Sequence, residues 1–213
     1  QGYSSAASDV YKRQVARFEE RAKIIEKYRG FLNAEPKITD GENHASVTEP
    51  KEIKIENMSF TYPGSDKPTL SDVNLTIKPY EKIALVGFNG AGKTTLTNLL
   101  LRLYDVSEGS IKIDGEDIRT VKTSEHRNRF AAVFQDFQIF SCNVGENVAL
   151  DSSYNSDDVK SALNHSGFDK KLKGGTQTEL LREFDDEGVM LSGGEAQKIA
   201  VARAFYKKCP YVI

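Results

Sequence analysis

The chain has 213 residues, a formal net charge of −2, 38% apolar residues and 28% charged residues, a composition that suits one globular domain with an appendage. It contains no run of about 18 apolar residues that would predict a membrane span, and its balanced charge gives no reason to expect nucleic acid as a partner. The cysteines, Cys142 and Cys209, lack the spacing of metal ligands, so we interpret both as ordinary reduced thiols.

The two ends of the sequence suggest a fragment. The first residue is Gln1 rather than methionine, and the last residues form the apolar run Tyr211–Ile213. The segment Ser5–Gln14 resembles translated adapter sequence of the kind left on assembled genes, and we hypothesise that residues 1–14 are not native. We therefore exclude this segment from reasoning about the fold.

Residues 15–50 predict a helix followed by a linker. Charged residues fill most faces of the helix, and one apolar stripe is formed by Val15, Phe18, Ala22, Ile25, Tyr28 and Leu32. Residues 39–50 are polar and include Gly41 and Pro50, which is typical of a linker. The stripe could pack on the chain's own domain, or it could belong to a helix that leads in from another part of the protein.

From residue 51 to residue 213 the pattern is that of a mixed domain. Apolar residues alternate from Ile53 to Phe60 and again within Asn74–Ile77, which predicts antiparallel strands. Ile83–Val86 is a continuous apolar run, which predicts a buried parallel strand. It leads into a glycine-rich loop and then into a helix that continues through Leu103.

The later elements follow the same logic. Short strands are predicted at Ile111–Ile113, which enters a tight turn at Asp114 and Gly115, and at Ala131–Phe134 and Tyr211–Ile213. Helices are predicted over Ser156–His165, with Ser156 as its cap, and over Gly194–Tyr206, with Ile199, Ala202 and Phe205 on one stripe.

The loop Gly87–Thr94 matches G-x-x-x-x-G-K-[ST] at every fixed position. A loop of this kind wraps its backbone N–H groups around phosphate at the positive end of a helix dipole. Lys93 would reach the β- and γ-phosphates as a catalytic residue, and the Thr94 hydroxyl would bind Mg²⁺. The expected nucleotide-binding residues are Gly87, Asn89, Gly90, Ala91, Gly92, Lys93, Thr94 and Thr95. The alternative is a glycine-rich turn without a ligand.

The pentapeptide Leu191–Glu195 is the second motif. Ser192, Gly193 and Gly194 place a hydroxyl and exposed N–H donors at the start of a helix, which can grip phosphate; a plain capped helix is the alternative. A chain with both motifs resembles the nucleotide-binding domain of an ABC transporter of the exporter type. The resemblance implies that Ser192, Gly193, Gly194 and Glu195 close on ATP held by a second domain. Glu195 replaces the family's common glutamine, and we expect its carboxylate to point away from the γ-phosphate.

The resemblance assigns roles to further residues. Tyr62 corresponds to an aromatic residue that stacks on adenine, the alternative being a strand-end tyrosine half buried in the sheet. Gln135, within the block Val133–Asp136, corresponds to a catalytic glutamine that contacts Mg²⁺ or the attacking water. The family's general base, a glutamate, is not found before Ile213, and neither is its Mg²⁺ aspartate nor its switch histidine.

The resemblance also implies a fold and a domain organisation. The fold class is α/β: a P-loop NTPase parallel sheet with an antiparallel β-subdomain and a helical signature subdomain over about residues 137–173, incomplete at the C-terminus. Residues 15–50 would be a linker helix and linker from a missing transmembrane domain, and residues 51–213 a nucleotide-binding domain truncated at its Walker B strand. The acidic loop Thr178–Gly188 would touch the transmembrane domain, or it would be a solvated charged loop.

We expect the intact protein to be an ABC exporter that couples ATP binding and hydrolysis to solute transport, with ATP and Mg²⁺ as cofactors. Its partners would be a transmembrane domain and a second nucleotide-binding domain, at the cytoplasmic face of the cell membrane. The alternatives are an ABC importer ATPase or a soluble non-transport ABC ATPase; residues 15–38 favour the exporter, and Leu191–Glu195 disfavours a P-loop kinase. The fragment itself is expected to be inactive, because the missing general base alone is worth about 10²–10⁴ in rate.

Overall fold

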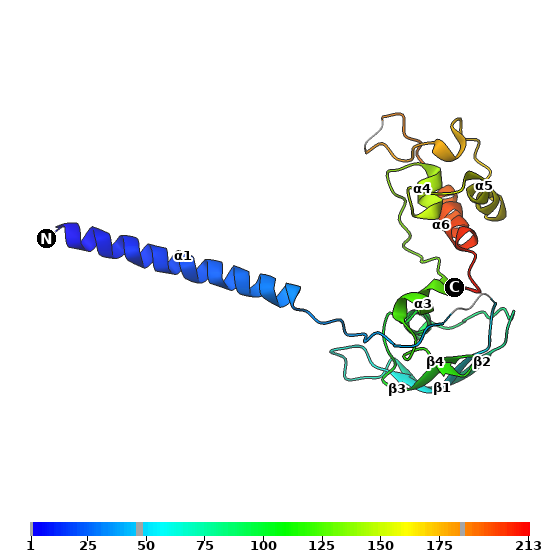
Figure 1. Ribbon diagram of the computed structural model, residues 1–213, viewed down its shortest axis with the longest axis horizontal. Helices are drawn as coiled ribbons and strands as arrows, with labels where there is room; N and C mark the ends of the chain where they lie inside the picture. Colours follow the sequence, from blue (N-terminus) through cyan, green and yellow to red (C-terminus); the bar gives the residue numbers. More distant parts are fainter. Residues whose placement is uncertain (1, 46–48, 184–185) are drawn as a thin grey trace. The chain divides into compact units, whose positions relative to one another are not determined.

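The computed structural model describes residues 2–45, 49–183 and 186–213, with the side chains of residue 14 and of residues from 17 onward within these ranges. The chain divides into two units, of which the first ends at Thr39 and the second spans Asp40–Ile213. The first unit contains α1 (Gly2–Leu32), drawn in blue in Figure 1. Residues 5–14 continue this helix without a break, and their non-native origin stays a hypothesis. The stripe residues Phe18 and Tyr28 are 79% and 66% exposed, so nothing within the first unit covers them.

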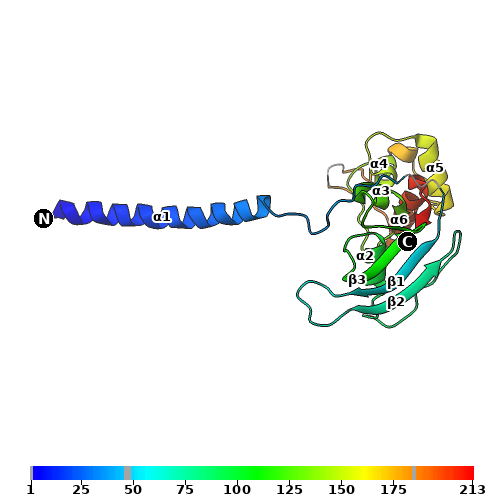
Figure 2. The same ribbon diagram turned by 60° about the horizontal axis from the view of Figure 1, so that its bottom comes forward.

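An antiparallel sheet forms one part of the second unit (Figure 2). Its central strand β1 (Ile53–Phe60) pairs with β2 (Leu70–Ile77) on one side and with β3 (Glu108–Ile113) on the other. β4 (Glu116–Asp117) pairs with β3 through a turn in which Asp114 and Gly115 have φ values of 54° and 82°. Two consecutive positive φ values match the twist of a two-residue hairpin, so the predicted strands and turn are confirmed.

The helix α2 (Lys93–Leu100) packs against this sheet and closes the first core. The core consists of buried apolar residues from both elements and their neighbours: Ile53, Ile55, Met58, Phe60, Leu96, Leu99, Leu100, Leu101, Ile111, Ile113, Ile118 and Phe130. α2 is shorter than the predicted helix through Leu103. Arg102 takes a φ of 50°, which lies outside the helical region, so the helix cannot continue.

The prediction of a buried parallel strand at Ile83–Val86 is wrong for this structure. The segment is not paired as a strand, and Ile83, Leu85 and Val86 are 41%, 41% and 93% exposed. A continuous apolar run fits a strand with neighbours on both sides and cover on both faces. Among the described residues no strand hydrogen-bonds to this run, so its apolar pattern is not matched by burial.

A short parallel pair does form elsewhere in the second unit. β5 (Phe130–Ala131) pairs in parallel with β6 (Tyr211–Val212), and the backbone N–H of Val133 donates to the Ile213 carbonyl at 2.9 Å, which extends the contact. The strands predicted at Ala131–Phe134 and Tyr211–Ile213 are therefore present in shortened form. The Phe130 and Tyr211 rings stack at 4.9 Å between centroids, which joins the pair to the first core.

Helices form the other part of the second unit, as Figure 1 shows. They are α4 (Val144–Ala149), α5 (Ser156–His165), a 3₁₀ turn at Gly175–Gln177 and α6 (Gly193–Lys207). A second core joins them, made of Val144, Val148, Val159, Ala162, Leu163, Leu180, Ile199 and Ala202. The helical subdomain is therefore wider than residues 137–173, because α6 completes its core.

Two details of the predicted helices are corrected. Asn155, not Ser156, caps α5: its side chain accepts from the backbone N–H groups of Asp157 and Asp158. An asparagine before the first helical residue satisfies these donors as well as serine does. On α6, Phe205 is 47% exposed and does not share the burial of Ile199, whose stripe it was predicted to continue.

The linker residues Asp40–Ala45 lie along the helix α3 (Thr123–Asn128), and we call this arrangement the linker clasp. The Asp40 carboxylate accepts from the N–H of Thr123 at 2.6 Å, and Asn43 exchanges backbone hydrogen bonds with Thr120 and Lys122. These contacts lower the pKa of Asp40, chiefly through the Thr123 N–H. Part of the predicted linker is therefore docked, while residues 46–48 lie outside the described residues.

His126 of α3 is fully buried and is held in its neutral form. Its Nε2 lies 2.8 Å from the Leu100 carbonyl, and its Nδ1 has no hydrogen-bond partner among the described residues. Burial is the main cause that lowers the pKa of His126 from 6.5 to about 4, and the charges of Arg129 and Arg102 add to the effect. A buried neutral imidazole with cationic neighbours must resist protonation.

We expect this histidine to make the second unit sensitive to mild acid. Below about pH 6.5 the imidazole of His126 becomes protonated in the unfolded chain but stays neutral in the folded chain. The free energy of unfolding therefore falls by about 3 kcal/mol in total by about pH 4. Denaturant unfolding at several pH values measures this slope. The His126→Gln variant keeps a donor for Leu100 and should lose the His126 part of the slope. Equal slopes in the two proteins would contradict the assignment.

Candidate nucleotide site

The glycine-rich loop is folded around the ammonium group of Lys93. Lys93 begins α2, and its Nζ donates to the carbonyl oxygens of Gly87 and Phe88, each at 2.8 Å. Gly90 and Gly92 have φ values of 84° and 86°, in the left-handed region that favours glycine. A Cβ at Gly92 would also collide with the Leu70 side chain. The loop therefore needs its glycines in order to turn into α2 with the lysine inside the turn.

The two threonines after Lys93 are placed differently. Thr94 is exposed in the first turn of α2, where its hydroxyl is accessible to a ligand. Thr95 is only 5% exposed, and its hydroxyl lies 3.1 Å from the hydroxyl of Tyr62. The predicted role of Thr95 as a phosphate donor is therefore in competition with an internal hydrogen bond.

Tyr62 lies two residues after the end of β1 and is half-buried. Its ring meets the rings of Phe60 and Tyr104 edge-on, with centroids 4.8 Å and 5.2 Å away. Edge-to-face pairs of this kind stabilise a cluster by about 0.5–1.5 kcal/mol each beyond burial. The tyrosine is thus part of the domain's packing, as the structural alternative predicts, and it links the sheet to Thr95 in α2.

Gln135 follows β5 and is exposed. The segment after it is tied to the helical part by Arg203 of α6, whose guanidinium donates to the carbonyls of Gln138 at 2.7 Å and Asn147 at 2.8 Å. The same guanidinium lies 5.6 Å from the centroid of the Phe140 ring. Burial lowers the pKa of Arg203, yet it leaves the charge in place and makes these contacts stronger.

The signature pentapeptide forms the start of α6 as predicted. Ser192 is the N-cap and takes part in a capping box: its Oγ accepts from the N–H of Glu195, and the Glu195 carboxylate accepts from the N–H of Ser192 at 2.7 Å. This arrangement satisfies two backbone donors that would otherwise be unpaired. The Glu195 carboxylate therefore accepts a hydrogen bond from its own chain.

Gly193 and Gly194 have no packing reason to be glycine in this structure. Both are exposed, and beyond its chain neighbours and the backbone of its own helix, a Cβ added to either would meet no heavy atom of the described chain within 4 Å. Neither has a positive φ, and glycine in a helix costs about 0.5–1 kcal/mol relative to alanine. Free space above an exposed helix N-terminus is a cradle that a bound anion can approach closely.

The phosphate loop and the signature pentapeptide are anchored in different cores. α2 is packed in the first core through Leu96, Leu99 and Leu100, while α6 is packed in the second through Ile199 and Ala202. Each motif is held by its own part of the second unit.

The acidic loop is closed by backbone contacts at its base. The N–H of Leu180 donates to the Cys142 carbonyl, and the N–H of Val189 donates to the Glu179 carbonyl at 2.9 Å. Ser141 donates to the Glu183 carboxylate at 2.8 Å. The loop is thus attached just ahead of α4, although residues 184 and 185, with part of the predicted acidic run, lie outside the described residues.

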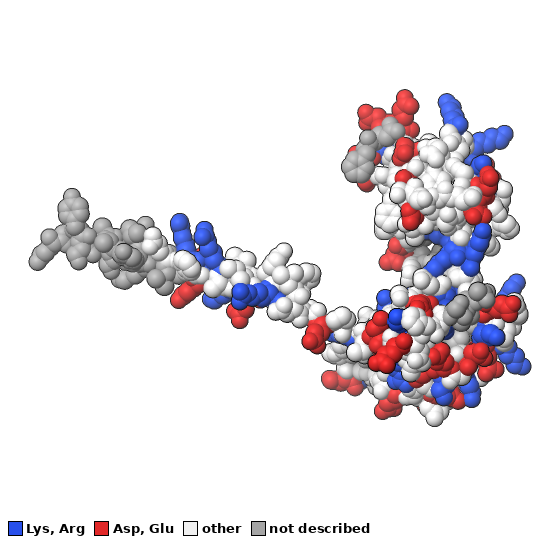
Figure 3. All heavy atoms as spheres, viewed as in Figure 1, with Lys and Arg blue, Asp and Glu red and all other residues white. Residues whose placement is uncertain are grey.

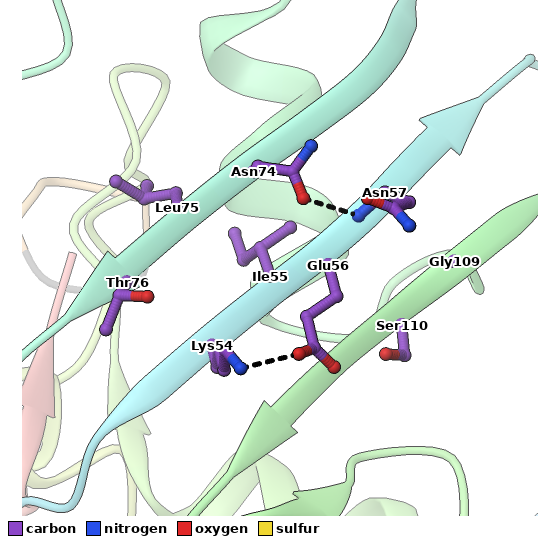
Figure 4. A pocket seen from close by; sticks show the side chains of 9 residues that line it. All are labelled: Lys54, Ile55, Glu56, Asn57, Asn74, Leu75, Thr76, Gly109 and Ser110. Atoms are coloured by element: carbon purple, nitrogen blue, oxygen red, sulfur yellow. Dashed lines mark hydrogen bonds and ion pairs between the residues drawn. The ribbon is translucent and has the colours of Figure 1, made fainter.

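A hollow on the outer face of the antiparallel sheet contains none of the predicted site residues (Figure 4). Its polar side chains already have partners: Glu56 is contacted at 2.6 Å by Lys54 and by the neighbouring Lys112, and Asn74 accepts from the backbone N–H of Asn57 at 2.9 Å. The ion pair with Lys112, followed by that with Lys54, lowers the pKa of Glu56 to about 2. Glu56 and Lys112 form a cross-strand pair between β1 and β3, and Lys54 pairs with Glu56 along β1, so the charges are accounted for by pairs on a solvated sheet.

Figure 3 shows acidic and basic side chains interspersed over the visible face of the second unit. Within the described residues, no group of three or more His, Cys, Asp and Glu side chains could hold a metal ion. The Thr94 hydroxyl and the Gln135 amide oxygen are ligands of the hard oxygen type, and their role in Mg²⁺ binding stays a prediction.

Two residues that contact the signature pentapeptide or the segment after Gln135 were not predicted. Lys170 pairs with Glu195 at 3.0 Å, and Arg203 joins α6 to the segment after Gln135. Lys170 lies outside any motif and has no fixed spacing from the pentapeptide. Arg203 gives a weak signal, because a cation within the apolar part of α6 indicates a specific partner.

Along the described residues, no helix combines the length and apolar character needed to cross a membrane. The family model described as ABC transporter matches residues 70–213. The chain is 38% identical over 188 residues to the ATP-dependent lipid A-core flippase of Methylobacillus flagellatus, covering 86% of this chain and 31% of that protein. The flippase of Escherichia coli is 36% identical over 167 residues, covering 76% and 28%.

Among solved structures, a bacterial Atm1-family ABC exporter with ATP bound is similar, with a TM-score of 0.78 and 29% identity. The match covers 93% of this chain and 35% of that exporter. The chain thus spans less than a third of the length of the flippases that it matches.

Proposed function

Because the chain belongs to the ABC transporter family, we propose that its second unit binds MgATP and drives an exporter whose membrane-spanning part lies outside these residues. The observation that carries the proposal is the pair of phosphate-binding elements held by separate cores: the loop around Lys93 and the open helix start at Gly193 and Gly194. Similarity to an exporter over 93% of the chain favours an exporter over an importer ATPase or a non-transport ATPase.

The loop and α2 supply the binding energy for the phosphates. In the structure Lys93 donates to two loop carbonyls, and a triphosphate in the loop would offer it charged oxygens instead. Charge-assisted hydrogen bonds are roughly twice as strong as neutral ones, so the exchange favours the bound state. The exposed Thr94 hydroxyl and the Gln135 amide oxygen are ligands of the hard type that Mg²⁺ prefers. Bound Mg²⁺ would neutralise phosphate charge.

The signature pentapeptide acts on the nucleotide of a second domain. Ser192, Gly193 and Gly194 are exposed at the start of α6, and their N–H groups and the helix dipole favour an anion. The absence of a Cβ lets the backbone of this turn come close to the γ-phosphate. Two copies, each giving its loop to one nucleotide and its signature turn to the other, would make a symmetric dimer.

Movement at the nucleotide can be passed to a membrane partner through Arg203. This residue holds α6, which carries the signature pentapeptide, to the carbonyls of Gln138 and Asn147. A shift of α6 therefore moves the segment after Gln135, which we propose contacts the transmembrane domain. The acidic loop, attached at Cys142 next to the same segment, is a second candidate contact. This organisation would place the second unit at the cytoplasmic face of the membrane.

Substitutions of Tyr62 test whether its ring stacks on the adenine base of ATP. Tyr62→Ala should cost about 1–3 kcal/mol of ATP affinity if the ring stacks on adenine, and Tyr62→Trp should roughly preserve the affinity. GTP should compete within about tenfold, because stacking does not read base edges. Isothermal titration calorimetry measures all three.

Tyr62→Phe is the matched control, because it keeps the ring against Phe60 and Tyr104 and removes only the contact to Thr95. It should bind ATP like the parent. Normal ATP binding by Tyr62→Ala would leave the tyrosine a purely structural role.

A further inference from the structure

Lys170 connects the two sides of the signature pentapeptide. It lies in the irregular segment after α5, and its Nζ donates to the Met190 carbonyl at 3.1 Å and to the Glu195 carboxylate at 3.0 Å. The neighbouring Asp169 pairs with Lys198 one turn further along α6, at 2.9 Å. The segment Asp169–Lys170 therefore lies across the first turn of α6.

Without a compensating cation, the negative charge of Glu195 would disfavour phosphate binding at this position. The carboxylate accepts from the N–H of Ser192 at 2.7 Å, and that bond, followed by the one from Lys170, lowers its pKa, so it is ionised near neutral pH. It lies one residue after two exposed glycines whose N–H groups suit an anion. An uncompensated negative charge beside a phosphate site repels the ligand.

We propose that Lys170 is a positioning residue that neutralises Glu195 and fixes the signature turn, so that this turn can accept the γ-phosphate of a second domain. The proposal rests on the function proposed above for the signature pentapeptide. The pair is well placed for this task, because the two side chains are only 28% and 24% exposed and are therefore less screened than a surface ion pair. The Met190 contact adds a second anchor just before Leu191.

The pairing is tested first on the 213-residue chain without nucleotide. A ¹³C-detected pH titration of the Glu195 carboxyl group should show its pKa rise toward the ordinary range in Lys170→Met. Lys170→Arg should keep it low. Lys171→Met is the matched control. It removes the same charge from the next residue, whose side chain is exposed, and it should leave the Glu195 titration unchanged. An unchanged titration in Lys170→Met would overturn the proposal.

The consequence is tested in the complete transporter by calorimetry with MgAMP-PNP and MgADP. Only the first carries a γ-phosphate, so Lys170→Met should weaken MgAMP-PNP binding by about tenfold, which is about 1.4 kcal/mol, and leave MgADP binding unchanged. Glu195→Gln removes the charge that needs compensation, so Lys170→Met combined with Glu195→Gln should recover most of the loss. A merely structural brace would lose affinity for both nucleotides and would not be rescued.

The outcomes separate this proposal from the proposed function. If Lys170→Met binds both nucleotides like the parent, or loses both equally, the role of Lys170 is wrong while the ATP site stands. If the parent binds neither nucleotide, or if Lys93→Ala binds MgADP and MgAMP-PNP normally, the proposed function fails, and the role of Lys170 fails with it.

Discussion

Replacing Lys93 by alanine is expected to weaken MgATP binding by roughly 10- to 150-fold. Charge-assisted hydrogen bonds to an ionised group are worth roughly 1.5–3 kcal/mol, and each 1.4 kcal/mol is a factor of ten in affinity. Lys93 is the cation that the loop encloses, held 2.8 Å from two of its carbonyl oxygens. Calorimetric titration of MgATP into the parent and the variant measures the effect.

The loss of two internal hydrogen bonds could also alter the loop in Lys93→Ala. The thermal transition of the variant should therefore be recorded, and we expect little change, because the loop is exposed. Lys82→Ala is the matched control: an exposed lysine of the same sequence stretch whose removal should leave MgATP binding within about twofold. Equal affinity of the parent and Lys93→Ala would refute the phosphate-loop assignment.

Gly194→Leu should abolish ATP hydrolysis by the complete transporter without harming the fold. Beyond its chain neighbours and the backbone of its own helix, the new Cβ meets no heavy atom of the described chain within 4 Å. Leucine is also a better helix former than glycine, so stability should be unchanged or slightly higher. In the proposed dimer the leucine would occupy the space of the γ-phosphate. Loss of a single preorganised donor costs about 10²–10³ in rate, and we expect a fall of roughly 100-fold or more.

Both the rate of ATP hydrolysis and the melting temperature should be measured for the parent, Gly194→Leu and a control variant. Asn164→Leu places the same side chain on an exposed position of α5, remote in sequence from both motifs, and it should leave hydrolysis unchanged. A Gly194→Leu protein that melts like the parent and hydrolyses ATP at the parental rate would show that the space above the signature turn is not used. A lower melting temperature would instead point to a packing role that the structure does not contain.

The phosphate loop and the signature helix were predictable because their chemistry is local. Gly90 and Gly92 are needed for positive φ values, and the donors that start α2 and α6 come from consecutive residues. The turn at Asp114 and Gly115 is local in the same sense. Such features depend on backbone geometry over a few residues, which the sequence displays directly.

The parts that escaped prediction depend on partners distant in sequence. Ile83–Val86 would be buried only between neighbouring strands, and its apolar pattern does not identify which strands would pair with it. Lys170 meets Glu195 only because the segment after α5 folds back over α6. The position of Tyr62 against Phe60 and Tyr104 is likewise set by the folded sheet, so the resemblance could suggest adenine stacking but not the packing.

The linker clasp shortens the tether, which is the free stretch of chain between α1 and the second unit. α1 ends at Leu32 and the clasp begins at Asp40, so the slack between them is residues 33–39, with a fully extended reach of about 25 Å. Asp40 is also the residue that satisfies the first N–H of α3, so tension on the tether acts directly on the start of that helix. The other end of α3 leads through β5 to Gln135 within the same short stretch of chain. A pull on the linker would therefore act on the helix that precedes Gln135, one of the predicted site residues.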